Sequence, residues 1–337
     1  MLQITTFAPF YRYIVLFYTM INRELIRLKA VQVSYSFYVG GRYNLEAAEK
    51  ELFLSLSKSY DLYNYLLLLM IEVNRIAERT YDTAVSRYQR LNEGEEPNPK
   101  FIQNKFLAQL EANNQLHEVV ENQKLTWADD EDFLRRLYRQ VTECEPYKEY
   151  MANPADSTYQ EDRELWRQIY RQVFVDNEEL DSLLEEKGIY WNDDRFIIDT
   201  FILKTLNRFE QKNGSRQPLL PEFKDEEDRE FARKLLRSSL LGAETYRTTI
   251  TQFLRGWELD RLAIMDVIIL QTALAEIMNF PNIPVSVSIN EYVNIAKMYS
   301  TPQSGRYING LLDNIARQFM ADGRLHKSMG GKEEKPE

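Results

Sequence analysis

Three neighbouring side chains, Gln303, Arg306 and Tyr307, could together hold a strand of RNA. A guanidinium group pairs with phosphate, and a tyrosine ring offers a face on which a base can stack. These residues open a predicted helix, because Thr301-Pro302 is a typical helix start. The free N–H groups and the dipole of a helix start favour an anion. The position therefore suits a phosphate group.

The same residues also have a purely structural interpretation. Arg306 could be solvated, and Gln303 could be an incidental residue of the first turn. Asn309 could form hydrogen bonds in the core, and Tyr307 could pack there. Spacing alone leaves both interpretations open.

The sequence around these residues predicts two consecutive helices. Ser288 and Glu291 have the spacing of a capping box, which predicts that the first helix starts at Ile289. The second helix has an apolar face at helical spacing: Tyr307, Ile308, Leu311, Leu312, Ile315 and Phe319. Glycine is unfavourable inside a helix, so Gly310 predicts that another helix approaches closely there.

A second candidate RNA-binding surface lies near the start of the chain. Residues 20–42 predict a helix that stops at Gly40. Arg23 and Arg27 are four residues apart and share one face of it, and Tyr35 lies two turns further on. We expect this helix and the Gln303–Tyr307 group to meet in the fold and form one cationic surface with aromatic rings.

Composition predicts an all-α protein without a metal or other cofactor. The chain has 337 residues, 44% of them hydrophobic and 28% charged, with only 12 glycines and 11 prolines. This composition is typical of a globular protein with long helices. The single cysteine, Cys144, excludes an internal disulfide, and His117 and His326 add few metal ligands. The glutamates beside Cys144 should raise its pKa, so we expect the thiol to be unreactive.

The charge is unevenly distributed along the chain. The net charge is −10, but residues 20–42 carry four basic residues and one acidic residue. Residues 226–327 carry twelve of each, and residues 43–225 carry 23 basic and 36 acidic residues. Since salt screens charges beyond about 8–10 Å, an acidic middle segment allows a basic patch elsewhere. We therefore expect RNA affinity to depend on a few placed contacts.

The sequence predicts a cytoplasmic protein with no membrane association. No apolar run reaches the roughly 20 residues that span a bilayer. The first 19 residues lack a basic leader and contain Pro9 and Arg12. Since a strong helix pattern follows Met20, residues 1–19 could be a non-native or disordered extension. The alternative is a cryptic membrane-targeting segment.

The middle of the chain predicts further helices joined by loops. We expect one or two buried helices over 45–91, a loop over 92–100, helices over 101–124 and 127–144, and a linker over 145–159. Residues 161–218 resemble residues 227–284 at a constant offset of 66, including the EDRE sequence and Trp191 with Trp257. This match predicts a duplicated helical module.

Three segments together resemble the NusB family of transcription antitermination factors. They read INRELIRLKAVQVSYSFY, RLAIMDVIILQTALAEI and INEYVNIAKMYSTPQSGRYINGLLDNIA, and they lie in the family's order. The resemblance covers residues 20–42 and 226–320. It implies an all-α, NusB-like helical bundle enlarged by an inserted, partly duplicated helical module. The expected division of the chain is an extension (1–19), the first core helix (20–42), an acidic helical insertion (43–225), the C-terminal core (226–326) and a disordered tail (327–337).

The resemblance also implies a function. NusB-family proteins bind the boxA element of nascent ribosomal RNA together with a small-subunit ribosomal protein called NusE. RNA polymerase, an indirect partner within the elongation complex, then reads through terminators. The residues that are similar to the family's RNA-contacting positions are Arg23, Arg27, Tyr35, Arg306 and Tyr307. Two departures stand out, because Glu24 replaces a frequent arginine and Gln303 replaces an aspartate found in some members.

Two other functions compete with RNA binding. A protein-binding helical scaffold without RNA binding would use the acidic insertion as its working surface. An enzyme is disfavoured, because the sequence has no glycine-rich loop after a strand and no cysteine nucleophile in a suitable setting.

Overall fold

The fold is built from helices. The computed structural model describes residues 21–327 and Met329, apart from residues 42–43, 93, 255–258 and 302. Over these residues the only β-type pairing is an isolated bridge between Ile21 and Phe223. The all-α prediction is therefore confirmed. Residues 1–19, Trp257 and nearly all of the predicted tail lie outside the described residues.

The α-helices range in length from 7 residues in α3 to 47 residues in α2. In chain order, the helices are α1 (Arg23–Val39), α2 (Leu45–Leu91), α3 (Lys105–Glu111), α4 (Asn114–Gln123), α5 (Glu131–Glu143), α6 (Glu145–Ala152), α7 (Tyr159–Ile169), α8 (Glu178–Lys187), α9 (Arg195–Arg208), α10 (Glu226–Leu241), α11 (Ala243–Phe253), α12 (Ile264–Asn279), α13 (Val285–Tyr299) and α14 (Ser304–Ala321). Short helical turns lie between them: η1 (Ala128–Asp130), η2 (Tyr170–Phe174), η3 (Asn192–Asp194), η4 (Gln211–Arg216) and η5 (Leu259–Arg261).

One long helix, α2, connects the two parts of the molecule. It has 47 residues and at 1.5 Å per residue is about 70 Å long. Asn44 caps its first turn, and Asn92, in the left-handed conformation, ends it. No proline or glycine interrupts the sequence between them. The prediction of one or two helices over 45–91 is thus realised as one.

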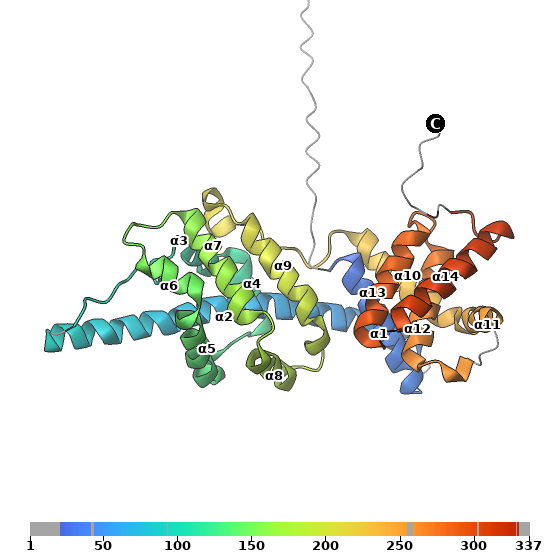
Figure 1. The fold of residues 1–337 in the computed structure, drawn as a ribbon, viewed down its shortest axis with the longest axis horizontal. Coiled ribbons are helices and arrows are strands. Elements are labelled where there is room, and N and C mark those ends of the chain that lie inside the picture. Colours follow the sequence, from blue (N-terminus) through green and yellow to red (C-terminus); the bar gives the residue numbers. More distant parts are fainter. Residues whose placement is uncertain are drawn as a thin grey trace, which may run out of the picture.

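Two groups of helices pack along α2 (Figure 1). The N-terminal part of α2 packs against α1 and α10, which belong to a bundle completed by α11–α14. Further along, α2 packs against α3, α4, α5 and α9. We call these four helices, together with α6 to α8 and η1 to η4, the second helix group. The predicted acidic insertion, residues 43–225, thus comprises α2 to α9. None of the helices within the described ranges is long and apolar enough to cross a membrane.

Two predictions for the middle segment are wrong. The single helix expected over 101–124 is divided into α3 and α4, because the Asn113 side chain accepts from the N–H of Leu116 and starts a new helix. The linker expected over 145–159 contains α6. Pro146 lies in the first turn of α6, where a missing N–H costs little. Proline at this position begins a helix, whereas the sequence pattern suggested that it breaks one.

The two predicted repeats have the same order of elements. The first contains α7, α8, η3 and α9, and the second contains α10, α11, η5 and α12; the first has in addition the turns η2, which continues α7, and η4. Asp162 and Asp228 occupy equivalent positions, and both are buried. Asp162 accepts from the backbone N–H of Lys105 at 2.7 Å, and Asp228 accepts from Arg23 Nε at 3.4 Å. Each aspartate therefore holds the first residue of a preceding helix.

The preceding helices, α3 and α1, also match each other. Asn104 and Asn22 cap them, each accepting from the N–H three residues later. Five residues after its cap, Gln109 bonds the carbonyl of Glu210, whereas Arg27 bonds the carboxylate of Glu276, 66 residues further on. These paired contacts support the predicted duplication and extend it to include α3. The duplication itself stays a prediction.

A buried ion pair fastens the second group of helices to α1. Lys29 Nζ lies 2.7 Å from Asp194 Oδ1, and both side chains are buried. Ser59 on α2 donates to the other oxygen of Asp194. Burial raises the pKa of Asp194, and the ammonium of Lys29 opposes that rise. Three chain segments therefore meet at one carboxylate.

We expect Asp194→Ala to lower the free energy of unfolding by about 3–5 kcal/mol, because it leaves the Lys29 ammonium buried without a partner. Urea denaturation measures this change. Asp129→Asn removes an exposed carboxylate elsewhere and should change stability by less than about 0.5 kcal/mol. Equal losses in the two variants would show that the ion pair does not fasten the groups.

Candidate nucleic-acid interface

The start of α14 is held in place by a cluster of hydroxyl groups. The Ser304 hydroxyl donates to Asp266 Oδ2 on α12 at 2.9 Å. The hydroxyls of Ser300 and Thr301 lie 3.0 and 2.9 Å from Ser304 Oγ. Asp266 and Ser304 are both buried. This cluster fixes the turn between α13 and α14 against α12, and with it the direction of the first turn of α14.

The side chains of that first turn face solvent. Gln303 occupies the N-cap position of α14, and Gln303, Arg306 and Tyr307 are all exposed. Arg306 forms no ion pair with any residue that the structure describes. Since an unpaired guanidinium beside free backbone N–H groups favours an anion, this position can accept a phosphate.

Lys297 on α13 adds a second cation that the sequence pattern did not single out. Its aliphatic stem crosses Gly305, where an added Cβ would lie 3.1 Å from Lys297 Cγ. Lys297 is exposed and, like Arg306, lacks an ion pair within the described residues. A signal was present in the sequence, since Lys297 follows Ala296 within the third of the segments that resemble the NusB family. We call Lys297, Gln303, Arg306 and Tyr307 the α13–α14 corner.

The structural interpretation of this stretch is wrong in two respects. Tyr307 is 38% exposed rather than buried in the core, and Asn309 is exposed as well. Burial and the charge of Asp266 raise the pKa of Tyr307, which keeps its phenol protonated. The close approach expected at Gly310 occurs instead at Gly305, because nothing lies within 4 Å of a Cβ built at Gly310.

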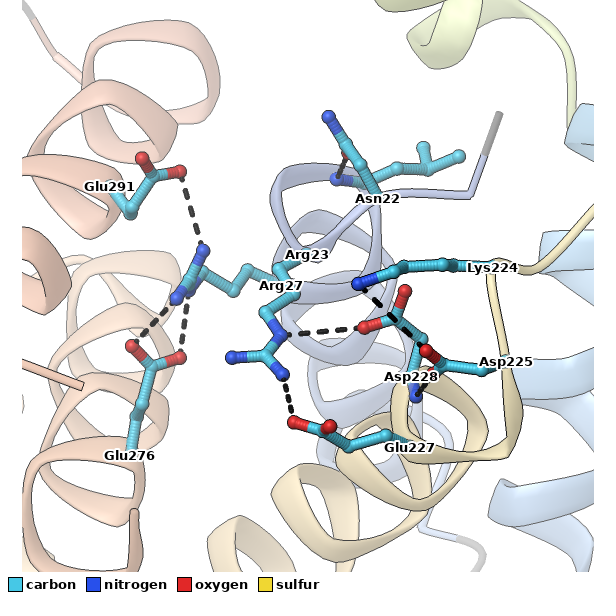
Figure 2. A network of polar contacts seen from close by, with 10 residues as sticks. Asn22, Arg23, Arg27, Lys224, Asp225, Glu227, Asp228, Glu276 and Glu291 are labelled. Carbon is cyan, nitrogen blue, oxygen red and sulfur yellow. Dashed lines mark hydrogen bonds and ion pairs between the residues drawn. The ribbon is translucent and has the colours of Figure 1, made fainter. Parts of the chain in front are cut away.

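Arg27 does not face solvent, so its predicted phosphate contact is wrong. It is 4% exposed and donates from Nε and Nη2 to both oxygens of Glu276, at 2.7 and 3.0 Å. Its Nη1 lies 3.6 Å from Glu291 (Figure 2). The charges of Glu276 and Glu291 keep the pKa of Arg27 raised despite burial. Because carboxylates inside the protein already neutralise its charge, Arg27 links α1 to α12 and α13 and is not available to bind RNA.

The same cluster overturns the predicted capping box. Helix α13 begins at Val285, so Ser288 lies inside the helix instead of capping it. The Ser288 hydroxyl donates to Glu276 at 2.7 Å, and Glu291 faces Arg27. Both side chains had the spacing of a cap, but their partners lie on other helices.

Arg23 and the α13–α14 corner lie apart. Arg23 is partly exposed and pairs with Glu227 and Asp228 on α10 at 2.7 and 3.4 Å, whereas Arg27 turns to Glu276 and Glu291 (Figure 2). Helix α12 gives a measure of the separation. Arg27 contacts it at Glu276, and Tyr307 interacts with it at Asp266, ten positions away. That is about 15 Å along the helix. The single compact surface expected from α1 and α14 is therefore not formed.

Tyr35 lies near the end of α12 that contains Asp266, because it shares a hollow with Met265. It is half-buried and lines a hollow of about 330 Å³ together with Gln32, Met265 and Tyr299. Gln32 donates to the Tyr299 hydroxyl at 3.0 Å and to Asp193 at 3.0 Å. An acidic residue that precedes α9 thus stands at the edge of this hollow.

Taken together, the fold and the corner define an all-helical protein with a small exposed surface that carries two cations and an aromatic ring. The NusB family model matches residues 199–317. The chain is 35% identical over 136 residues to the transcription antitermination protein NusB of Salinibacter ruber, covering 39% of this chain and 85% of that protein. It belongs to the NusB family, as the resemblance implied.

Other similarities cover less of the relative or carry less weight. The NusB of Chloroherpeton thalassium is 37% identical over 103 residues, which is 31% of this chain and about half of the relative, 49%. A solved structure of T. maritima NusB covers 37% of this chain and 87% of its own, with 29% identity and a TM-score of 0.29.

We expect Arg27→Gln to lower the free energy of unfolding by about 3–5 kcal/mol, since it leaves the Glu276 carboxylate buried without its cation. Arg23→Gln is the matched control. It breaks a partly exposed pair, whose loss costs about 0–1 kcal/mol. Chemical denaturation of both variants checks this difference, and similar losses would contradict the assigned structural role of Arg27.

Proposed function

We propose that the protein is a transcription antitermination factor that binds boxA-like nascent ribosomal RNA through the α13–α14 corner. It acts with a NusE-type small-subunit ribosomal protein, and this complex promotes read-through by RNA polymerase. The observation that carries the proposal is the pair of exposed cations without ion-pair partners among the described residues, Lys297 and Arg306, beside Tyr307 at a helix start. The antitermination names of its relatives support it. The proposal assigns no catalytic step to the protein.

Each residue of the corner has a distinct part in this proposal. Lys297 and Arg306 pair with phosphates, and Gln303 offers an amide to a base or a ribose. Tyr307 stacks on a base, a contact worth about 1–3 kcal/mol. An RNA strand that continues along α1 reaches Tyr35 and then Arg23. Arg23 contributes less, because Glu227 and Asp228 already match its charge.

The acidity of the chain limits how tightly RNA binds without sequence preference. With a net charge of −10, the protein as a whole repels a polyanion. Lys297 and Arg306 must therefore attract the RNA phosphates over short distances. Few phosphate contacts imply a shallow dependence of affinity on salt, and they explain why a protein partner would be needed for tight binding.

We expect a boxA-like RNA to bind more tightly than a scrambled RNA of the same composition, and a NusE-type protein to increase that difference. Filter-binding titrations with and without the partner measure both effects. Equal affinity for the two RNAs, or no binding even with the partner, would refute the proposal and favour the protein-binding scaffold.

Removing the two free cations should weaken binding in a predictable way. For Lys297→Gln/Arg306→Gln we expect the slope of log affinity against log salt to fall by about 1.4, because each phosphate contact to a single strand contributes about 0.7. Arg317→Gln, which removes an exposed arginine paired with Asp313 on the same helix, should leave the slope unchanged. A slope that is unaffected by the double variant would place the RNA elsewhere.

A further inference from the structure

An acidic groove lies where the second helix group meets the end of α13. Its hollow has a volume of about 1120 Å³. Residues 176–185, which include most of α8, and η3 with the start of α9 form most of its walls, and Met298 and Tyr299 at the end of α13 complete them. The groove therefore exists only because the helices of the middle segment stand beside the bundle that contains α13.

The groove carries a large excess of negative charge. Six carboxylates line it with one guanidinium: Asp176, Glu178, Asp181, Glu185, Asp193 and Asp199 with Arg195. Arg195 is buried and already pairs with Asp181 at 2.7 Å and with Asp199 at 3.0 Å. Asp176, Glu178 and Glu185 form no ion pair with the residues that the structure describes. Asp193, which accepts a hydrogen bond from Gln32, forms none with them either, so four carboxylates of the groove lack a cation among the described residues.

The carboxylates of the groove are also crowded. Burial, together with the charges of Asp176 and Glu178, raises the pKa of Asp181, although Arg195 opposes the rise. Negative charges that raise one another's pKa are stabilised when a cation comes between them. A positively charged ligand would therefore relieve the repulsion among these carboxylates.

The groove also exposes large apolar side chains. Phe196, in the first turn of α9, is 44% exposed, and Met298 on the facing helix is 42% exposed. Tyr299 is half-buried beside them, and Trp191 lines the same hollow. Aromatic and methionine side chains that stand exposed in a concave surface are typical of protein-binding sites. A small cation would leave these apolar walls uncovered.

We propose that this groove binds an extended lysine- and arginine-rich segment of a protein partner, whose apolar side chains alternate with its cations. The cations pair with Asp176, Glu178 and Glu185, and the apolar side chains pack against Phe196 and Met298. RNA is repelled by the same carboxylates. A metal ion does not fit, because no group of three or more acidic, histidine or cysteine side chains within the described residues could hold one.

The groove is separate from the α13–α14 corner, and the proposal holds whether or not the corner binds RNA. The groove instead adjoins the hollow beside Tyr35 at Tyr299, whose hydroxyl donates to the carbonyl of Asp193 at 3.4 Å. The hollow that contains Tyr35 lies on the other side of that contact, since Asp193 and Tyr299 line both hollows. A partner in the groove would neutralise charge beside the path of the RNA.

The test uses the full chain and a fluorescein-labelled peptide in which lysine and arginine alternate with leucine. Fluorescence anisotropy should show saturable binding that weakens with salt. We expect Glu178→Gln/Glu185→Gln to weaken binding about tenfold or more, which is about 1.4 kcal/mol. Glu118→Gln/Glu121→Gln removes the same charge from the exposed face of α4 and should leave the affinity within about twofold. Circular dichroism of each variant confirms that the fold is kept.

A second pair of measurements tests the apolar part of the groove. Phe196→Ser removes no charge, and we expect it to weaken binding of the leucine-containing peptide but not of a peptide with glycine in place of leucine. Equal losses in the groove variant and the α4 variant would overturn the proposal, since they indicate attraction to net charge alone. Binding that never saturates, or that ignores Phe196, would overturn it too.

Discussion

The buried carboxylate of Glu276 is the point on which the arrangement of the bundle depends. Arg27, Ser288 and Tyr292 all direct polar atoms to it, so α1 and α13 are both held against α12. Removing a partner of a buried charge strongly lowers the stability of the fold. The orientation of α1 that brings Arg27 to Glu276 is therefore favoured over others. With α1 fixed in this way, Lys29, two residues beyond Arg27, meets Asp194 of the second helix group. One helix thereby sets the position of both halves of the molecule.

This arrangement separates opposite charges by placing them on different elements. The corner takes its cations from the end of α13 and the start of α14, whereas the groove takes its carboxylates from α8, η3 and the start of α9. Salt screens exposed charges beyond about 8–10 Å. A chain with net charge −10 can therefore keep a surface that attracts an anion. Of the carboxylates that line the groove, Asp193 also reaches the hollow beside Tyr35, where Gln32 and Tyr299 hold it.

The sequence predicted the features that depend on local pattern. Helical spacing indicated the class of fold, the extent of α2 and the buried face of α14, because a 3.6-residue period reports directly on which side is buried. It could not identify the partner of a charged residue. Arg27 and Arg23 are one turn apart and look alike in sequence, yet one faces Glu276 inside the bundle and the other lies at its edge. Ser288 and Glu291 had cap spacing, but both found tertiary partners.

The two predicted repeats differ at the position of Arg27, and among the described residues a second such corner is not formed. On α3, before the first predicted repeat, Gln109 takes the place of Arg27 and bonds the backbone carbonyls of Glu210 and Gly214, so this position carries no charge. After α9 the chain continues through η4 directly to α10, and within the described residues nothing follows that corresponds to α13 and α14. Helix α2 packs against α9 and α3. The first predicted repeat therefore lacks counterparts of the Arg27–Glu276 ion pair and of α13 and α14. Without those two helices it cannot form a cationic helix start, so its exposed surface is the acidic one.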